Sequence, residues 1–170
     1  YVHDNRKNLT EKIGVENEKF VKVDNPLSDE YGALRHLMTP SLLKVLQLNK
    51  HHAYPQKFFE TGNVAKLDNS KVGASNQKKT AFIQTGEETD FTDARKTLQV
   101  LERDLGIELE VEDSIKPFFQ DTRSGKISLN HEEIGFIGQF SEKVLDNWEI
   151  NKPAAGFELN LEKIQEALKK

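Results

Sequence analysis

The strongest constraint on the fold is a pair of strand-like segments joined by a short turn. Residues 126–130 and 134–140 flank His131-Glu132-Glu133 and predict a β-hairpin. Residues 107–112, which precede them, alternate between apolar and acidic side chains and predict a half-buried strand. Hairpin turns join antiparallel strands, whereas parallel strands need long crossover connections. We therefore expect a largely antiparallel sheet with helices packed on it, an α+β fold.

Local signals at the ends of apolar segments predict the helices. Thr39 can cap a helix and Pro40 is tolerated in its first turn, so a helix is expected from Thr39 to about residue 50. Asp90 and Gly106 are typical of the start and the end of a second helix. Two shorter helices are expected to begin after Ser141 and Asn160.

The remaining strands are predicted from short apolar segments. A strand at 57–61 is expected to stop at Gly62, and two more are expected at 80–85 and 154–160. Residues 66–79 have almost no apolar side chains, which predicts a surface loop or a hairpin tip. A turn-rich loop is expected at residues 24–32.

Composition limits the classes of protein to which the chain can belong. With 170 residues, 36% hydrophobic and 31% charged, it is predicted to form one soluble domain over residues 1–170. Its apolar runs are too short to span a bilayer, so no membrane partner is expected. Cysteine is absent, which excludes thiolate chemistry and is compatible with a reducing cytosol. The net charge of −4 disfavours nucleic-acid binding by a basic surface.

His51 and His52 are the most conspicuous candidates for a metal or catalytic site. Adjacent side chains point about 100° apart on a helix and to opposite faces of a strand, so neither geometry brings both to one metal. The remaining histidines, His3, His36 and His131, lie far off in the sequence. We expect histidines of a turn that are exposed or hydrogen-bonded, and no metal site. If protonated, they would complement the C-terminal dipole of the preceding helix.

Other catalytic signatures are missing from the sequence. The Gly-x-Ser-x-Gly turn of serine hydrolases is absent, and so are both glycine-rich phosphate-binding loops. The two glycines within residues 135–140 fit a strand in which glycine permits close backbone packing. The residues alone therefore predict an α+β domain in which no catalytic residue, cofactor-binding residue or metal ligand can be identified.

Two blocks of sequence carry several motifs in a fixed order. The first block, residues 25–64, contains Asn25-Pro26-Leu27-Ser28, Leu34-Arg35, Leu42-Leu43, Asn49-Lys50-His51-His52, Pro55-Gln56 and Phe59-Glu60-Thr61-Gly62. The second, residues 134–164, contains Gly-x-Ile-Gly, Leu-x-Asn-Trp, Pro-Ala-Ala and a Phe-Glu-Leu strand. Together these blocks closely resemble the beta subunit of phenylalanyl-tRNA synthetase, in its archaeal and eukaryotic form. The resemblance spans nearly all of the chain.

The resemblance implies the catalytic-like module of that subunit. Such a module has the fold of a class II aminoacyl-tRNA synthetase domain, an antiparallel sheet flanked by helices. In the family, two alpha and two beta subunits form the enzyme, and the alpha subunit uses ATP and magnesium to charge tRNA with phenylalanine. The resemblance thus implies that the chain is part of a cytoplasmic ligase and that its partner is the alpha subunit. It also implies that tRNA is bound through the holoenzyme and that this module holds no cofactor.

A working class II site needs two arginines that clamp the phosphates of ATP. One should follow the first strand, yet residues 58–62 contain none and the next is Arg95, beyond another strand. The other should follow a glycine-rich strand, yet residues 154–170 contain one glycine and no arginine. We therefore expect a non-catalytic structural module that supports the alpha subunit. The alternative is a free-standing relative that binds a small amino acid or nucleotide in the old site.

The sequence also departs from the family pattern in two places. Residues 36–40 replace Thr-Ser-Leu-Leu-Pro, and residues 118–125 replace a Phe-x-x-Gly-Arg stretch, so the hairpin edge near Arg123 is expected to be rebuilt. The first helix of the family's module should precede Tyr1. The chain is therefore expected to be a fragment of a longer subunit or a trimmed relative.

Surplus apolar surface predicts where the alpha subunit would bind. Leu43 and Leu48 widen the apolar face of the helix at 39–50 beyond one core-facing stripe. Phe58 and Phe59 point to opposite faces of their strand, so one should enter the core and the other should lie under a helix or in a subunit contact. The predicted interface residues are Leu43, Leu48 and Phe58.

Overall fold

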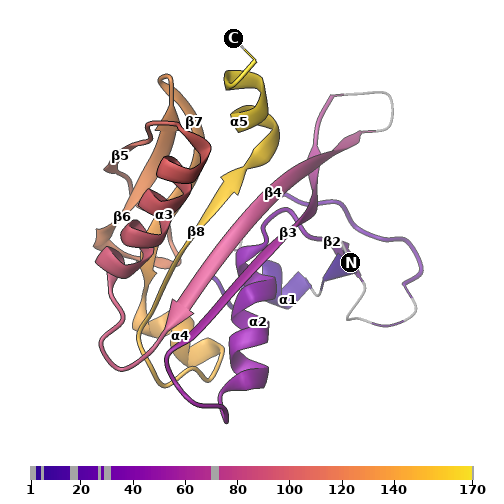
Figure 1. Ribbon diagram of the computed structural model, residues 1–170. Coiled ribbons are helices and arrows are strands. Elements are labelled where there is room, and N and C mark those ends of the chain that lie inside the picture. The colour runs from indigo at the N-terminus through magenta and orange to yellow at the C-terminus, as the bar shows by residue number, and fades with distance from the viewer. Residues whose placement is uncertain are drawn as a thin grey trace.

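The computed structural model describes residues 3–4, 6–15, 19–26, 28, 32–69 and 73–169, and its architecture is α+β (Figure 1). A six-stranded sheet has the order β3-β4-β8-β7-β6-β5, and each pair of neighbouring strands is antiparallel. These strands are β3 (Gln56–Leu67), β4 (Ala74–Thr85), β5 (Glu110–Asp113), β6 (Phe119–Leu129), β7 (Glu132–Phe140) and β8 (Ala154–Asn160). β1 (His3–Asp4) and β2 (Ala33–Leu34) form a separate pair. The predicted antiparallel α+β architecture is confirmed.

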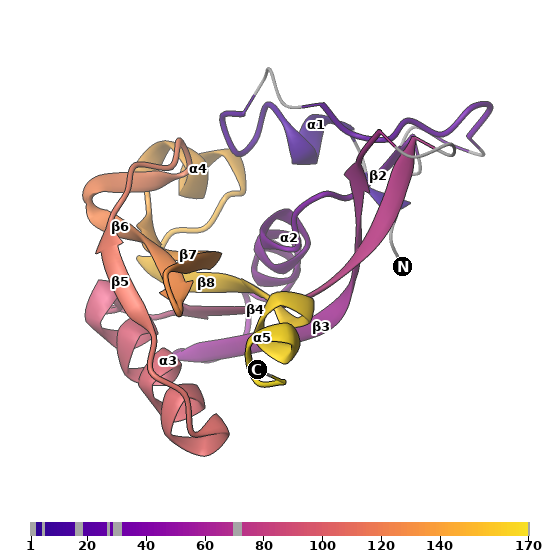
Figure 2. The same ribbon diagram turned by 90° about the horizontal axis from the view of Figure 1, so that it is seen from above.

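Helices lie on both sides of the sheet (Figure 2). α1 (Arg6–Leu9), α2 (Thr39–Asn49) and α4 (Glu142–Asn147) lie on one side, which we call the α2 face. α3 (Phe91–Leu105) and α5 (Leu161–Ala167) lie on the other side, the α3 face. Each face has its own core, with Leu42, Leu46 and Trp148 in the first and Leu98 and Phe157 in the second. β8 lies in the middle of the sheet, and all seven of its residues are buried.

Several predicted helix ends are confirmed by their hydrogen bonds. The Asp90 carboxylate accepts the N–H of Asp93 and the Asp93 carboxylate accepts the N–H of Asp90, a reciprocal capping box. Gly106 ends α3 with a φ of +64°, which costs glycine little because it has no Cβ. Ser141 and Asn160 likewise accept backbone N–H groups at the starts of α4 and α5.

The hairpin of β3 and β4 is longer than the sequence predicts. β3 does not stop at Gly62 but continues to Leu67, and the two strands pair over twelve residues from Gln56↔Thr85 to Leu67↔Ala74. The prediction failed because backbone pairing does not depend on apolar side chains, and β3 lies at the edge of the sheet, where polar residues are tolerated. The loop predicted at 66–79 is thus reduced to the hairpin tip. Residues 70–72 of this tip lie outside the described residues, as do residues 27 and 29–31 of the loop predicted at 24–32.

The strand predicted at 107–112 begins later than expected, because β5 starts at Glu110. The preceding residues are attached to the end of α3 instead. The N–H of Ile107 donates to the carbonyl of Glu102, and the N–H of Leu109 donates to the Glu102 carboxylate. These bonds hold residues 107–109 against the helix. The apolar–acidic alternation therefore places the start of the strand three residues too early.

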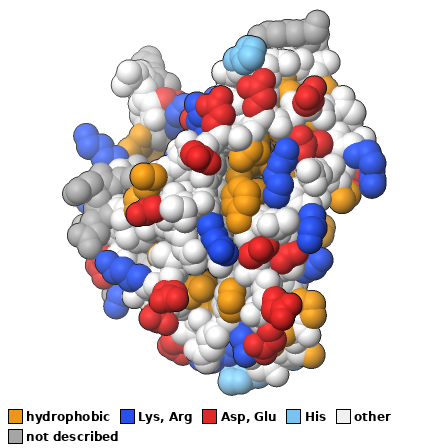
Figure 3. Space-filling view, turned by 90° about the vertical axis from the view of Figure 1, so that its left-hand side faces the viewer, with side chains coloured by type: hydrophobic (Ala, Val, Ile, Leu, Met, Phe, Trp, Pro, Cys, Tyr) orange, Lys and Arg blue, Asp and Glu red, His pale blue; other side chains and the backbone are white. Residues whose placement is uncertain are grey.

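The surface view shows how charged and hydrophobic side chains are distributed on one face of the molecule (Figure 3). On the face shown in Figure 3, acidic and basic side chains are mixed, and the largest group of hydrophobic side chains forms a narrow central band, with smaller groups elsewhere. A bilayer-spanning helix is not found among the described residues, because each helix there is too short or too polar for that role.

Candidate functional site

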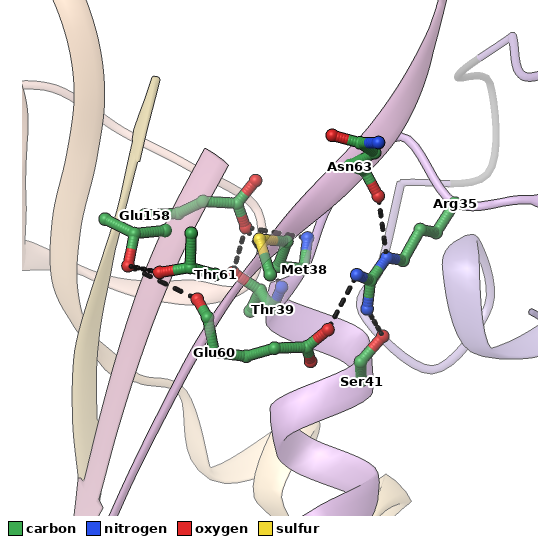
Figure 4. A network of polar contacts seen from close by, with 9 residues as sticks. Arg35, Met38, Thr39, Ser41, Glu60, Thr61, Asn63 and Glu158 are labelled. Carbon is green, nitrogen blue, oxygen red and sulfur yellow. Dashed lines mark hydrogen bonds and ion pairs between the residues drawn. The ribbon is translucent and has the colours of Figure 1, made fainter. Parts of the chain in front are cut away.

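The most unusual polar group of the molecule is a carboxylate at the centre of the sheet. Glu158 is only 1% exposed, and in the sequence of β8 it stands between Phe157 and Leu159, whose side chains belong to the core of the opposite face. Its Oε2 accepts the N–H groups of Met38 and Thr39, both at 2.9 Å, and the Thr39 hydroxyl at 2.8 Å (Figure 4). Its Oε1 accepts from the Lys79 ammonium at 2.9 Å. One carboxylate therefore joins β8, β4 and the start of α2.

This arrangement corrects the predicted cap of α2. The N-cap position is Met38, which makes no side-chain cap hydrogen bond, and Thr39 is the first helical residue. Thr39 contributes its hydroxyl to Glu158 instead of accepting a backbone N–H. The free N–H groups and the positive end of the helix dipole both favour a nearby anion, which Glu158 provides from 120 positions away. Pro40 stands in the first turn as predicted.

A second ion pair lies beside the first, on the edge strand. Arg35 is 4% exposed, and its Nη2 donates to Glu60 Oε1 at 2.7 Å. Its Nη1 donates to the Ser41 hydroxyl at 3.0 Å, and its Nε donates to the carbonyl of Asn63 at 3.2 Å (Figure 4). All three nitrogens of the guanidinium are engaged, so Arg35 ties the start of α2 to β3.

The Phe-Glu-Thr-Gly stretch has a structural explanation in this pair. Glu60 supplies the carboxylate, and Gly62 leaves room for the guanidinium, because a Cβ added at Gly62 would lie 2.9 Å from Arg35 Nη2. The neighbouring side chain of Phe59 points away and is 79% exposed. The Phe-Glu-Thr-Gly motif of the first block thus serves an ion pair inside the domain.

Two arginines elsewhere in the described residues are engaged in a similar way. Arg95, on α3, pairs with Glu102 at 2.6 Å, and Arg123, on β6, donates to Gln139 Oε1 at 2.8 Å. Arginine clamps phosphate through a planar fork of donors, and a guanidinium that is already bonded has few donors left for a ligand. The network can hold strands and a helix together, and we assign it no step of chemistry.

The two adjacent histidines lie in the turn after α2, where both are exposed. The N–H of His52 donates to the carbonyl of Asn49 at 2.9 Å, and the carbonyl of His52 accepts from Gln56 Nε2 at 3.1 Å. The same Gln56 nitrogen also donates to the carbonyl of Asn49. The expected turn is confirmed. In the described part of the chain, no group of three or more His, Asp or Glu side chains is arranged to hold a metal ion.

The predicted interface residues have three different environments. Leu43 is fully buried in the core of the α2 face, so it is not available at the surface for contact with a partner. Leu48 is 70% exposed, and Phe58 is partly buried against the same core. Sequence periodicity predicts too much exposure for Leu43. The sheet and the N-terminal segment together bury a wider part of the α2 surface than a single apolar stripe. The interface itself stays a prediction, with Phe59 as the exposed member of the phenylalanine pair.

Sequence reasoning missed the central roles of Glu158, Lys79 and Arg35. One signal was available for Glu158, because a carboxylate inside the apolar run Ala154–Leu159 would be buried and would need partners. Nothing in the sequence indicates which partners these are.

The fold and the network together define an α+β domain whose buried charges hold its own elements in place. The chain belongs to the family described as the phenylalanyl tRNA synthetase beta chain CLM domain, which it matches over residues 3–161. It is 37% identical over 151 residues to the phenylalanine–tRNA ligase beta subunit of Pyrococcus abyssi, which covers 88% of this chain and 27% of that protein. It is 40% identical over 144 residues to the beta subunit of Thermococcus kodakarensis, which covers 84% of this chain and 25% of that protein.

A more distant relative extends the match. The beta subunit of Methanocaldococcus jannaschii is 33% identical over 155 residues, which cover 91% of this chain and 28% of that protein. The chain therefore spans about a quarter of the length of these relatives.

Proposed function

We propose that this chain is the non-catalytic structural module of a phenylalanine–tRNA ligase beta subunit. In this role it supports a catalytic alpha subunit during the ATP-dependent charging of tRNA with phenylalanine. The family match and the relatives, which are beta subunits of this ligase, support the assignment. The six-stranded antiparallel sheet is compatible with the class II synthetase fold, which we propose for the module.

The observation that carries the proposal is the position of Arg35. It lies between β2 and α2 and reaches β3, the strand after which an ATP-clamping arginine would be expected, yet its guanidinium is buried and bonded to Glu60, Ser41 and the carbonyl of Asn63. Glu158, in the second block of family motifs, bonds to Met38 and Thr39 in the first. The two blocks of sequence thus support one another, which is the expected arrangement in a scaffold.

The wider assembly belongs to the same proposal. We propose a cytoplasmic holoenzyme with two alpha and two beta subunits, in which the alpha subunit binds ATP and magnesium and this module binds neither. We propose that tRNA is bound by the holoenzyme rather than by this module alone. The net charge of −4 supports this last point, because the overall field of the chain repels phosphate.

Exchange of pyrophosphate with ATP tests the absence of catalysis. The isolated chain should show no phenylalanine-dependent exchange, whereas a complex of alpha and beta subunits should show it. Measurable exchange by this chain alone would contradict a purely structural role.

Co-purification with an alpha subunit tests the partner. We expect Leu48→Lys to reduce recovery of the complex, because it places a charge on an exposed leucine of α2. Val100→Lys is the matched control, since Val100 is an exposed apolar residue of α3. Circular dichroism should show that both variants fold. Equal recovery of both would mean that this end of α2 is not part of the interface.

A further inference from the structure

A surface cavity lies next to Glu158, and the scaffold role does not account for it. It has a volume of about 370 Å³ and lies where β8 passes into α5. This volume falls within the roughly 300–1,000 Å³ of small-molecule sites. The charged side chains that line it are Lys66, Lys79, Lys116, Lys163, Glu133 and Glu158.

The charges of this cavity are unequal in number and differ in their partners. Four lysines face two glutamates, so the formal balance is positive although the whole chain is negative. Glu158 is already neutralised, because both of its oxygens are engaged by Lys79 and by the start of α2. Lys163 pairs with Glu132 at 3.1 Å.

Lys66 and Lys116 are the lining lysines without a carboxylate partner among the described residues, and the Glu133 carboxylate of the lining offsets part of their charge. Neither has a carboxylate oxygen within 4.0 Å among the described residues, in contrast to Lys79 and Lys163. The Lys116 ammonium lies 5.7 Å from the centroid of the Phe136 ring, which also lines the cavity. Lys66 comes from β3 and Lys116 from the segment before β6, so the two cations reach the cavity from opposite parts of the sheet.

Further donors are also available in the cavity. An ammonium has three N–H groups, and Lys79 uses two of them on Glu158 and on the carbonyl of His36. Asn160 uses its side-chain oxygen to cap α5, which leaves its amide group as a donor. Among the polar groups of the lining, cations and N–H donors outnumber carboxylates, which suits an anion with several acceptor oxygens.

We propose that this cavity binds a small phosphate-bearing anion, held chiefly by Lys66 and Lys116 with Lys79 as an additional donor. Lysines act on phosphate as mobile point charges, so the site would bind without the rigid fork that catalysis on ATP requires. A small ligand is favoured over the backbone of a nucleic acid, because the positive charge is confined to one cavity of a negative chain. This proposal does not depend on the alpha subunit.

Isothermal titration of the whole chain with inorganic phosphate and with pyrophosphate tests the site. We expect saturable binding that is tighter for pyrophosphate, because it carries more charge and more acceptors. The double substitution Lys66→Gln and Lys116→Gln should weaken binding about tenfold or more, since two charge-assisted contacts are lost. The matched control is Lys57→Gln with Lys143→Gln, which removes the same charge from exposed lysines outside the cavity.

The outcomes separate a site from general attraction. Weaker binding in the cavity variant alone, with unchanged thermal unfolding of both variants, supports the proposal. No saturable binding at millimolar pyrophosphate, or equal weakening in the control, would overturn it. A short single-stranded RNA is added as a competitor, and tighter binding of this RNA with the same dependence on Lys66 and Lys116 would also overturn it in favour of a nucleic-acid surface.

Discussion

The two ends of α2 are held by charged groups in opposite surroundings. At its start, the buried Glu158 accepts the N–H groups of Met38 and Thr39. At its end, Lys50 pairs with Glu149 at 2.6 Å, where both side chains reach solvent. The exposed contact is the shorter one, yet water competes for both of its partners. Burial, rather than distance, therefore decides how much the removal of a charge should cost.

The largest effect is expected at the start of α2. Glu158→Ala would leave the Lys79 ammonium and two backbone N–H groups without their buried acceptor. We expect the free energy of unfolding, measured by urea denaturation, to fall by about 3–5 kcal/mol. Glu158→Gln keeps one acceptor and should lose less. A surface ion pair contributes up to about 1 kcal/mol. If Glu158→Ala lost less than that, the buried contact at the start of α2 would be no stronger than the exposed contact at its end.

A second test adds a methyl group next to Arg35, near the start of α2, without removing a charge. In Gly62→Ala the new methyl group would lie 2.9 Å from Arg35 Nη2. The guanidinium cannot move aside without breaking its bonds to Glu60 and Ser41, so we expect a loss of about 1–3 kcal/mol. The control is Thr61→Ala on the exposed side of the same strand, which should change stability by less than about 1 kcal/mol. Equal effects of the two would show that Arg35 has room to shift.

A third test concerns the end of α2 and the adjacent histidines. Gln56→Ala removes two hydrogen bonds to the carbonyls of Asn49 and His52, and should cost about 1–2 kcal/mol in urea denaturation. His51→Ala should stay within about 0.5 kcal/mol, because its side chain is exposed. If His51→Ala were the more damaging, the histidine side chain rather than Gln56 would hold this turn.

Elements with local signals could be predicted from the sequence. The capping box of Asp90 and Asp93, the left-handed Gly106 and the caps at Ser141 and Asn160 each involve residues within a few positions of one another. The strand at 154–160 was predicted with its observed bounds. In these segments the local preference and the tertiary structure agree, as expected for a natural sequence.

The candidate site could not be predicted because its contacts are long-range. Glu158 lies 119 and 120 positions from its partners in α2, and Arg35 lies 25 positions from Glu60. The cap of α2 was wrongly assigned to Thr39 for the same reason. When no distant acceptor is known, a cap from a neighbouring side chain is the default expectation. Leu43 was misjudged for a related reason, because the sequence does not indicate how much of a helix its neighbours cover.

The smallest effect is expected at the exposed pair of Lys50 and Glu149, and this effect should depend on pH. The Lys50 ammonium holds the pKa of the Glu149 carboxyl below its ordinary value, chiefly through their hydrogen bond. A carboxyl whose pKa is lowered on folding stabilises the fold above its unfolded pKa of about 4.3. This contribution is lost as the pH falls through the lower pKa of the folded state. The difference in thermal stability between the unmodified chain and Glu149→Gln should thus be small at pH 7 and vanish in acid.

Added salt provides the decisive control for this last comparison. Screening weakens an exposed pair but hardly affects a buried one, so the effect of Glu149→Gln should shrink in high salt while that of Glu158→Ala persists. Glutamine preserves the side-chain length at a position with a φ of +54°, so backbone strain is the same in both chains. If the effect of Glu149→Gln were unchanged by salt and by acid, the end of α2 would be stabilised by packing of the side chain, and the contrast between its two ends would not be electrostatic.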